Sequence, residues 1–254
     1  YCNNFTIKGV WLRDSPFWTV HPYSCSNVTV ESVRISSPLW AASTDGIDPD
    51  SCDNVLIKDC DITSSDDHVA IKSGKDESGR AYGKPSTNIR VEGGRFGHGY
   101  GVSIGSEMSG GVYNVTVDGV RFEDTLYVAR VKTCRGRGGE VSNITFRNLD
   151  VSRVQSKAIF FDMYYKQSPP VQPVRQTTPH VHDWTLSNIT GTAAAAGAFA
   201  CLPESPCHDI VLENVQLRAV GGFRCLHAYG TAVDVSPESC LADQETMGGR
   251  RQWA

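Results

Sequence analysis

The sequence predicts an all-β chain that winds as a parallel β-helix, a single-stranded solenoid of short stacked strands. A unit of Asn or Asp followed by alternating apolar residues recurs eight times, at intervals of 23 to 40 residues around a base period near 25. Such a period is typical of a solenoid. Within each unit apolar and polar residues alternate, which is the pattern of a strand with one buried face.

The first row of predicted strands begins at the repeated Asn or Asp. The units start at Asn4, Asn27, Asn54, Asn88, Asn114, Asn143, Asp183 and Asp209. No unit has a convincing helical stretch, which argues against leucine-rich or ankyrin-type repeats. We expect about eight coils in a single domain over residues 1–240, followed by an irregular tail at 241–254.

A second row of strands follows the first by about 16 to 20 residues. Its centres are Val20, Ile47, Ile71, Ile104, Val131, Phe161, Ala200 and Leu226. Equivalent strands of a β-helix stack about 4.8 Å apart. Residues matched in this row are therefore expected to be neighbours in space.

Bulk composition excludes some partners. The net charge is −4 and the pI is near 6, so the chain has no global reason to bind nucleic acid or an anionic membrane. No apolar run approaches the roughly 18 to 20 residues of a membrane span. Strand-like sequence begins already at Asn4. We expect the chain to start inside its fold without an N-terminal cap, leaving an open sheet edge.

The repeated Asn residues have two interpretations. Stacked at one corner, they would form a ladder of hydrogen-bonded amides. Several also begin Asn-x-Thr glycosylation sequons, namely Asn4, Asn27, Asn114, Asn143 and Asn188. We favour the ladder for the first-row residues. There the sequon arises from the strand pattern itself, in which an apolar residue and a Thr follow the Asn.

Nine cysteines form no Cys-x-x-Cys pair, so a zinc ribbon is not indicated. Cys2, Cys25 and Cys52 each lie two residues before a first-row Asn. They are expected to stack, either as thiols or with one disulfide. Cys201 with Cys207 and Cys225 with Cys240 are weaker candidate disulfides.

Residues able to do chemistry gather on the second row. They are Asp45, Asp48, Asp66, Asp67, Lys72, His98, Arg130, Lys132, Tyr164 and Tyr165. If successive coils are in register, Asp45 meets Asp66 and Asp67, and three carboxylates converge. Clustered like charges are costly unless proton transfer uses them. The strip therefore predicts an acid/base site along the solenoid axis, suited to a long polymer.

Each member also has an ordinary explanation. Asp is a common turn residue, His98 in Gly-His-Gly fits a loop, and Arg130 with Lys132 fits a solvated strand face. Tyr165 suits core packing as well as a site wall. Arg135 and Arg137 are expected to be turn residues that add positive potential nearby.

In order and spacing, STDGIDPDS, SSDDHVAIKSG, GHG, SIGSEMSGGV and ARVKTCRGRGG resemble the family 28 glycoside hydrolases, the polygalacturonases. The resemblance implies a right-handed parallel β-helix and hydrolysis of α-1,4 links in polygalacturonate with inversion. It also implies a secreted enzyme that degrades cell-wall pectin. We expect a monomer with no cofactor and no metal.

Residue roles come with the resemblance. Asp66 would be the general acid, and Asp45 with Asp67 would activate water, with inverting carboxyls roughly 6.5 to 9.5 Å apart. His98 would tune the acid by hydrogen bonding. Arg130 and Lys132 would hold a galacturonate carboxylate, and Tyr165 would flank the scissile sugar.

The sequence departs from the family pattern at several positions. The family usually has Asn at Ser43, Gly at Ser65, often Cys at His68, and Gly at Val128. Tyr100 and Gly101 are extra residues before the SIGS segment, which could misplace His98. Two alternatives stay open: a pectate lyase-like enzyme with Ca²⁺ on the Asp cluster and Arg130 as base, and a non-catalytic pectin-binding β-helix.

Overall fold

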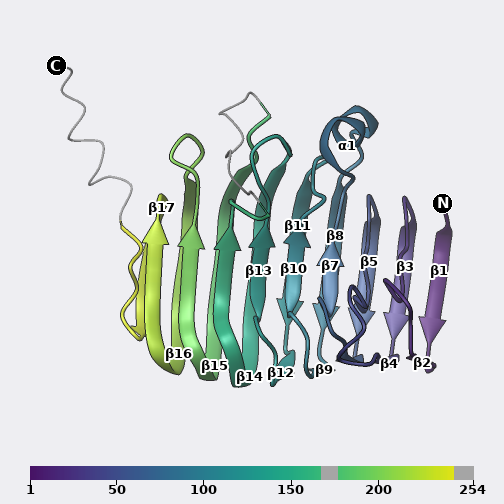
Figure 1. Ribbon diagram of the computed structural model, residues 1–254, viewed down its shortest axis with the longest axis horizontal. Coiled ribbons are helices and arrows are strands. Elements are labelled where there is room, and N and C mark those ends of the chain that lie inside the picture. The colour runs from purple at the N-terminus through teal and green to yellow at the C-terminus, as the bar shows by residue number, and fades with distance from the viewer. Residues whose placement is uncertain (167–176, 243–254) are drawn as a thin grey trace.

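The computed structural model describes residues 1–166 and 177–242. Its strands line up side by side from β1 at one end to β17 at the other, so each coil lies against the next (Figure 1). The pairings between named strands are parallel and form three sheets along the solenoid axis.

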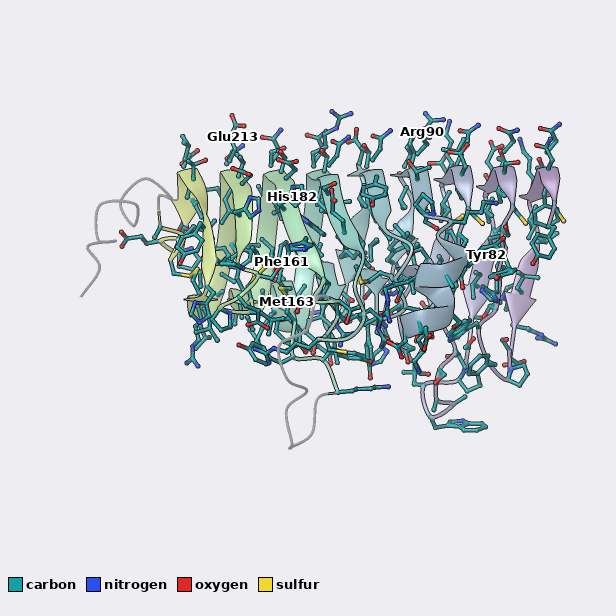
Figure 2. The ribbon with its side chains drawn as sticks, turned by 90° about the horizontal axis from the view of Figure 1, so that it is seen from above. Tyr82, Arg90, Phe161, Met163, His182 and Glu213 are labelled. Carbon is teal, nitrogen blue, oxygen red and sulfur yellow. A yellow bond between two sulfur atoms is a disulfide. The ribbon has the colours of Figure 1, made fainter. Side chains whose placement is uncertain are left out.

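Sheet 1 is the predicted first row. It comprises β1 (Asn3–Lys8), β3 (Ser26–Glu31), β5 (Asp53–Lys58), β8 (Ser86–Glu92), β11 (Val112–Asp118), and the first parts of β14 (Glu140–Asp162), β15 (His180–Ala200), β16 (Cys207–Leu226) and β17 (Ala228–Ser236). Its polar side chains point away from the coil, as the labelled Arg90 and Glu213 show (Figure 2).

Sheet 2 was missed from the sequence. It comprises β2 (Trp11–Arg13), β4 (Arg34–Ser36), β6 (Asp61–Thr63), β9 (Arg95–Phe96), β12 (Arg121–Glu123) and the middle of β14, β15 and β16. From β2 to β12 only two residues separate each of these strands from the preceding sheet 1 strand, so their short alternation merges with that of the first row. The prediction of two rows was incomplete.

Sheet 3 is the predicted second row. It comprises bridges at Val20 and Ile47, then β7 (Val69–Ile71), β10 (Val102–Gly105), β13 (Ala129–Lys132) and the last parts of β14 to β16. Two registers were wrong, since Ile47 pairs with Val69 rather than Ile71, and Phe161 pairs with Phe199 rather than Ala200. In both places the observed partners keep two apolar side chains facing the core.

The core is a set of apolar ladders inside the coil. One ladder in sheet 1 pairs Val28, Val55, Ile89, Val115, Ile144, Trp184 and Ile210 in register, and all are buried. Burying each such side chain contributes roughly 1.5–3 kcal/mol. The stacked coils are therefore held mainly by contacts between neighbours.

The repeated Asn has a conformational reason. Each first-row Asn or Asp has a positive φ, for example 55° at Asn54 and 54° at Asp209. Asn and Asp tolerate this left-handed conformation better than other residues with a Cβ. The repeat therefore marks a bend that recurs once per coil.

The amide ladder is present, but at the surface. Asn54 donates to Asn27 at 2.6 Å and Asn114 donates to Asn88 at 2.6 Å, whereas Asn27 donates to Asn3 and Asn88 to Asp53. Asn4 and Asn143 make no side-chain hydrogen bond within the described ranges. The ladder is thus interrupted, and its amides are exposed rather than buried.

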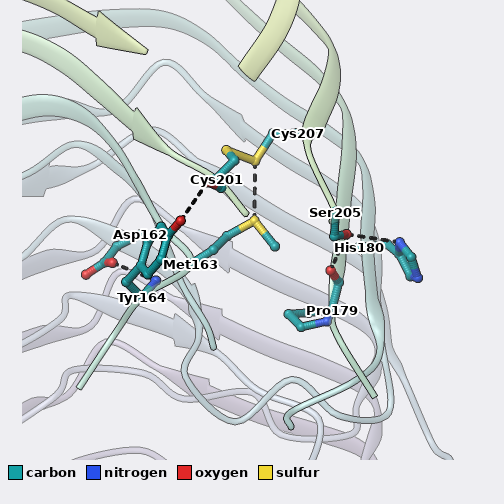
Figure 3. The surroundings of a disulfide bond; sticks show 8 residues. All are labelled: Asp162, Met163, Tyr164, Pro179, His180, Cys201, Ser205 and Cys207. Carbon is teal, nitrogen blue, oxygen red and sulfur yellow. Dashed lines mark hydrogen bonds between the residues drawn. A yellow bond between two sulfur atoms is a disulfide. The ribbon is translucent and has the colours of Figure 1, made fainter. Parts of the chain in front are cut away.

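The cysteines follow both predictions. The Cys25 N–H donates to the Cys52 sulfur at 3.3 Å, and both thiols are buried and free. Disulfides join Cys201 to Cys207 and Cys225 to Cys240. The first lies against Met163, whose sulfur is 3.5 Å from the Cys207 sulfur (Figure 3).

A short helix, α1 (Asp76–Tyr82), projects beyond the strand ends and was not predicted. Acidic residues occupy its first turn, and Gly83 ends it at φ 61°. In the parts of the chain that the structure describes, no helix has both the length and the apolar character needed to cross a membrane.

We predict that Asn54→Ala lowers the free energy of unfolding by about 1–2 kcal/mol, because alanine lacks the short polar side chain that lets asparagine tolerate the left-handed conformation. Asn54→Gly should cost less, since glycine adopts positive φ without steric penalty. Urea unfolding of both variants measures the difference. Equal destabilisation would assign the effect to the lost amide contact instead.

Candidate active site

Three carboxylates from successive coils converge over sheet 3. The Gly46 N–H donates to the Asp67 carbonyl at 2.9 Å and the Ile47 N–H to the His68 carbonyl at 3.0 Å, which places Asp45 against the next coil. One oxygen each of Asp45, Asp66 and Asp67 lies within 4.8 Å of the others. The convergence expected from the sequence is therefore observed.

Asp67 is an ionised carboxylate held by cations. Its side chain is fully buried and receives a hydrogen bond from Ser103 at 2.5 Å and an ion pair from Lys132, with Arg130 at 3.6 Å. Burial alone would raise its pKa, but Lys132 and Arg130 hold the pKa of Asp67 below its ordinary value. Both of its oxygens are thus engaged.

The pKa values of Asp45 and Asp66 are raised, in contrast to that of Asp67. Burial, followed by the charges of Asp67 and Asp66, raises the pKa of Asp45 to about 7. Burial and then the charge of Asp67 raise the pKa of Asp66. Asp66 is half-buried, whereas Asp45 and Asp67 are buried. The cluster thus combines one carboxyl group of lowered pKa with two of raised pKa.

Arg130 and Lys132 project from the same face of β13, as expected. The guanidinium carbon of Arg130 lies 4.6 Å from the ring centre of Tyr127 and 5.5 Å from that of Tyr165. In the described ranges Arg130 makes no hydrogen bond, and its buried Nε has no partner. Its donors are available for an anion, whereas Lys132 already binds Asp67.

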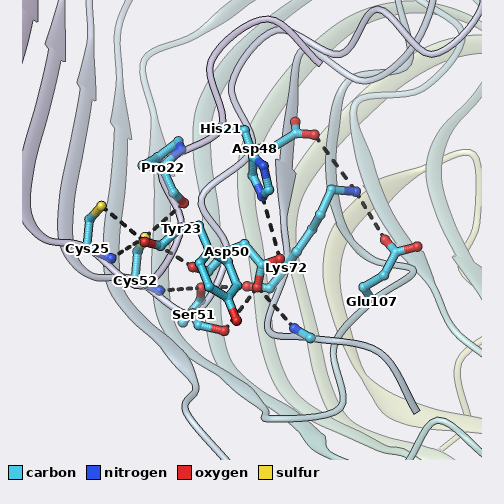
Figure 4. A network of polar contacts seen from close by, with 12 residues as sticks. His21, Pro22, Tyr23, Cys25, Asp48, Asp50, Ser51, Cys52, Lys72 and Glu107 are labelled. Carbon is cyan, nitrogen blue, oxygen red and sulfur yellow. Dashed lines mark hydrogen bonds and ion pairs between the residues drawn. The ribbon is translucent and has the colours of Figure 1, made fainter. Parts of the chain in front are cut away.

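A buried charge network borders the cluster (Figure 4). Lys72 donates to Glu107 at 3.2 Å, lies 3.9 Å from Asp48, and has its ammonium 4.2 Å from the ring centre of Trp18. Burial favours protonated Glu107, yet Lys72 holds the pKa of Glu107 at about 2. Sequence reasoning found Asp48 and Lys72 but missed Glu107, which the motif SIGSEMSGGV contains.

Arg135 and Arg137 do not act as free positive charges. Arg135 forms a two-point ion pair with Glu204, with Nη2 to Oε2 at 3.0 Å. Arg137 pairs with Asp76 of α1 at 2.6 Å. Carboxylates thus neutralise both side chains, and the expectation that they add positive potential was wrong.

The two neighbouring tyrosines have different surroundings. Tyr165 has the Arg130 guanidinium and the Lys132 ammonium, at 5.7 Å, near its ring. Tyr164 instead packs near Arg135 and donates to the Cys201 carbonyl at 3.4 Å (Figure 3). Tyr165 is the one beside the site cations.

His98 does not contact the acid. Its Nδ1 lies 3.1 Å from the Ser64 carbonyl, and no hydrogen bond joins His98 to Asp66 in residues 1–166 and 177–242. Tyr100 contacts Asp66 through the backbone, because its N–H donates to the Asp66 carbonyl at 2.9 Å. The sequence signal was the Gly-Tyr-Gly directly before β10.

His68 lies inside the coil and holds the segment 97–101, which contains His98 and Tyr100. Its Nδ1 accepts the Gly101 N–H at 3.0 Å, so its Nε2 donates to the Gly97 carbonyl at 3.0 Å. Burial lowers the pKa of His68 to about 4, so the ring is neutral. It stacks on Phe96 with ring centres 5.1 Å apart.

The acidic cluster is a poor fit for calcium. Three carboxylates within 4.8 Å could ligate a cation. However, Lys132, Ser103 and Arg130 already surround the Asp67 oxygens. The donor set is that of an ion-paired acid/base site.

The comparisons agree with this geometry. The family model for glycosyl hydrolases family 28 matches residues 1–234. A probable polygalacturonase of Arabidopsis thaliana is 32% identical over 95% of this chain and 52% of its own length. One of Vitis vinifera is 32% identical over 96% of this chain and 52% of its own. The chain thus spans about half the length of these relatives.

Two solved structures are similar. The Thermotoga maritima exopolygalacturonase aligns with a TM-score of 0.74 at 30% identity, covering 89% of this chain and 52% of its own. The Erwinia carotovora polygalacturonase aligns with a TM-score of 0.74 at 29% identity, covering 91% and 58%. The predicted right-handed parallel β-helix is confirmed. With its model match and its relatives in accord, the chain belongs to glycosyl hydrolases family 28.

Proposed function

We propose that the protein hydrolyses α-1,4-galacturonosidic bonds of polygalacturonate. The observation that carries this proposal is the meeting of Asp45, Asp66 and Asp67 beside the cations of β13. Its family and the polygalacturonases similar to it support the same reaction. Arg130 would bind a uronate carboxylate by charge-assisted hydrogen bonds, with Tyr165 beside the sugar.

Asp66 is the general acid of the proposed mechanism. A general acid must hold a proton and reach the leaving oxygen. Two observations favour Asp66 for this role: burial and the charge of Asp67 raise its pKa, and its side chain is only half-buried. Asp67, which is ionised, and Asp45 activate water from the other side of the sugar.

Attack by water fits this site better than attack by a carboxylate. The oxygens of the cluster lie within 4.8 Å, closer than the 6.5 to 9.5 Å usual between inverting carboxyls. Spacing alone would suggest a retaining pair. Asp67, however, has both oxygens engaged by Ser103 and Lys132, which makes it a poor nucleophile. We therefore propose inversion.

The setting of the enzyme is also proposed. Two disulfides suit an oxidising, extracellular compartment. We infer a secreted monomer acting on cell-wall pectin without a cofactor, with neither nucleic acid nor membrane as partner.

Asp66→Asn should lower kcat on polygalacturonate by about 1,000-fold, because the leaving oxygen loses its proton donor. Reducing-end release measures this, and Asp150→Asn, at an exposed carboxyl outside the site, is the matched control. Proton NMR of the first product should show the β-anomer.

Two outcomes would contradict hydrolysis, and a third would contradict only its stereochemistry. Ultraviolet absorbance from unsaturated products, abolished by EDTA, would indicate a lyase. Polygalacturonate binding without turnover by the wild type would indicate a binding module. An α-anomeric first product would contradict inversion alone.

Lys132→Met should move the acid limb of kcat/KM to higher pH by about one unit. Lys132 helps to hold the pKa of Asp67 down, so without it Asp67 takes up a proton at higher pH and the base is lost earlier. A pH–rate profile measures the shift, with Lys58→Met as the control. Lys132→Arg, which keeps the positive charge, should leave the acid limb at its wild-type pH. An acid limb that does not move in Lys132→Met would contradict the role of Lys132 in holding the Asp67 pKa down.

Asp45→Asn should stabilise the fold above pH 7. Folded Asp45 keeps its proton to about pH 7, against an ordinary value of 3.8, so ionisation makes the wild type less stable as pH rises through this window. The amide cannot ionise. Melting temperatures should differ by on the order of 5 °C at pH 8 and should coincide at pH 3, where Asp45 is protonated in both states. A constant difference at both pH values would show that ionisation is not the cause.

A further inference from the structure

We propose that Tyr127 is the positioning residue of Arg130. Its ring holds the guanidinium off Asp67, so that Arg130 keeps its donors for a uronate carboxylate. The inference rests on the proposed hydrolysis and adds to it a contact between a ring and a cation, on which the choice of a free uronate over its methyl ester depends.

Three aromatic rings surround Arg130. Its guanidinium carbon lies 4.6 Å from the ring centre of Tyr127, 5.5 Å from that of Tyr165 and 5.7 Å from that of Tyr100. The face of an aromatic ring attracts a cation within about 6 Å. Tyr127 is the nearest of the three, so its ring has the largest part in placing the guanidinium.

The Tyr127 ring is itself held between neighbouring coils. It stacks on Phe160 of the next coil, with ring centres 5.4 Å apart and planes at 22°. Its other neighbour is Tyr100 of the preceding coil, which meets it edge-on at 6.1 Å. The Thr125 hydroxyl donates to the Tyr127 carbonyl at 2.7 Å. The ring is therefore in place before any ligand arrives.

Asp67 is the competitor for the Arg130 guanidinium. Arg130 Nη1 lies 3.6 Å from Asp67 Oδ1, beyond the roughly 3.2 Å of an ordinary hydrogen bond. Ser103 donates to the same oxygen at 2.5 Å, and Lys132 binds the other oxygen. Asp67 thus has its donors without Arg130. A short movement of the guanidinium would add a further hydrogen bond to Asp67 and withdraw a donor from the substrate, and attraction to the Tyr127 ring opposes that movement.

The two cations of β13 consequently differ in what they offer a ligand. Lys132 is bound to Asp67, whereas the Arg130 side chain makes no hydrogen bond to any residue that the structure describes. A guanidinium carries only donors and matches a carboxylate in a two-point, charge-assisted pair. A methyl ester has no anionic oxygen for such a pair. Arg130, in the orientation that Tyr127 gives it, therefore selects the free uronate.

Tyr127→Leu tests the role of the ring. We expect KM for polygalacturonate to rise about tenfold while kcat stays within about twofold, because substrate binding loses its oriented cation. Tyr127→Phe keeps the ring face and should retain the wild-type KM. Trp11→Leu is the matched control, because it removes a ring whose centre lies 4.9 Å from the Arg34 guanidinium carbon, outside the site. Its KM should equal that of the wild type.

A second substrate separates positioning from a general structural role. On partly methyl-esterified polygalacturonate, Tyr127→Leu should lose less kcat/KM than on the free polymer, because fewer of the bound sugars carry a carboxylate. An equal loss on both substrates would overturn the proposal. An unchanged KM in Tyr127→Leu would overturn it as well, and so would a Tyr127→Phe variant as impaired as Tyr127→Leu.

A readout independent of turnover separates this inference from the proposed function. In proton–nitrogen NMR, the Arg130 Nε–H signal, assigned by its loss in Arg130→Lys, should lie upfield of the other arginine Nε–H signals, because a proton over an aromatic face is shielded. The shift should persist in Tyr127→Phe and disappear in Tyr127→Leu. An unshifted wild-type signal would overturn the contact. An inactive wild type with the shifted signal would refute hydrolysis while supporting the placement of Arg130.

Discussion

The hydrogen-bond register between coils decides whether this protein has a site at all. Gly46 and Ile47 donate to the carbonyls of Asp67 and His68, and this offset alone brings Asp45 onto the pair one coil later. A slip of one residue would turn side chains to the opposite face. The apolar ladders inside the coil resist such a slip, because each core residue would leave its partner. Catalytic geometry and core packing therefore share one constraint.

Local features of this architecture could be predicted from the sequence. The Asn that opens each unit marks a left-handed bend, and a bend depends on one residue's own conformational preference. The triplets of sheet 2 and the seven-residue helix α1 were too short to show a period of their own. The pairing of Ile47 with Val69 depended on the path of the intervening loop, which alternation does not encode.

Site residues with a local sequence signal were found, and those defined by contacts between coils were missed. Asp45 stands out in a run with three aspartates, and Asp66 and Asp67 stand out because they are adjacent acids next to a strand pattern. Arg130 and Lys132 were recognisable as one face of a strand. Glu107 and Tyr100 lie in connections, and their contacts exist only once coils three and four are stacked. Arg135 and Arg137 were misjudged because their carboxylate partners, Glu204 and Asp76, are remote in sequence.

Electrostatic balance explains how so many acids can lie together. Lys132 and Arg130 compensate Asp67, and Lys72 lies closer to Glu107, at 3.2 Å, than to Asp48, at 3.9 Å. In the described structure both Asp48 oxygens are buried and lack hydrogen bonds. A buried carboxylate in that state would be very costly, whereas a carboxylic acid is far less so. Burial and the charge of Asp45 accordingly raise the pKa of Asp48 well above its ordinary value. With Asp48 neutral, Asp45 meets one repulsive neighbour fewer when it ionises, and the ionised carboxylate is the form in which the proposed base can accept a proton from water.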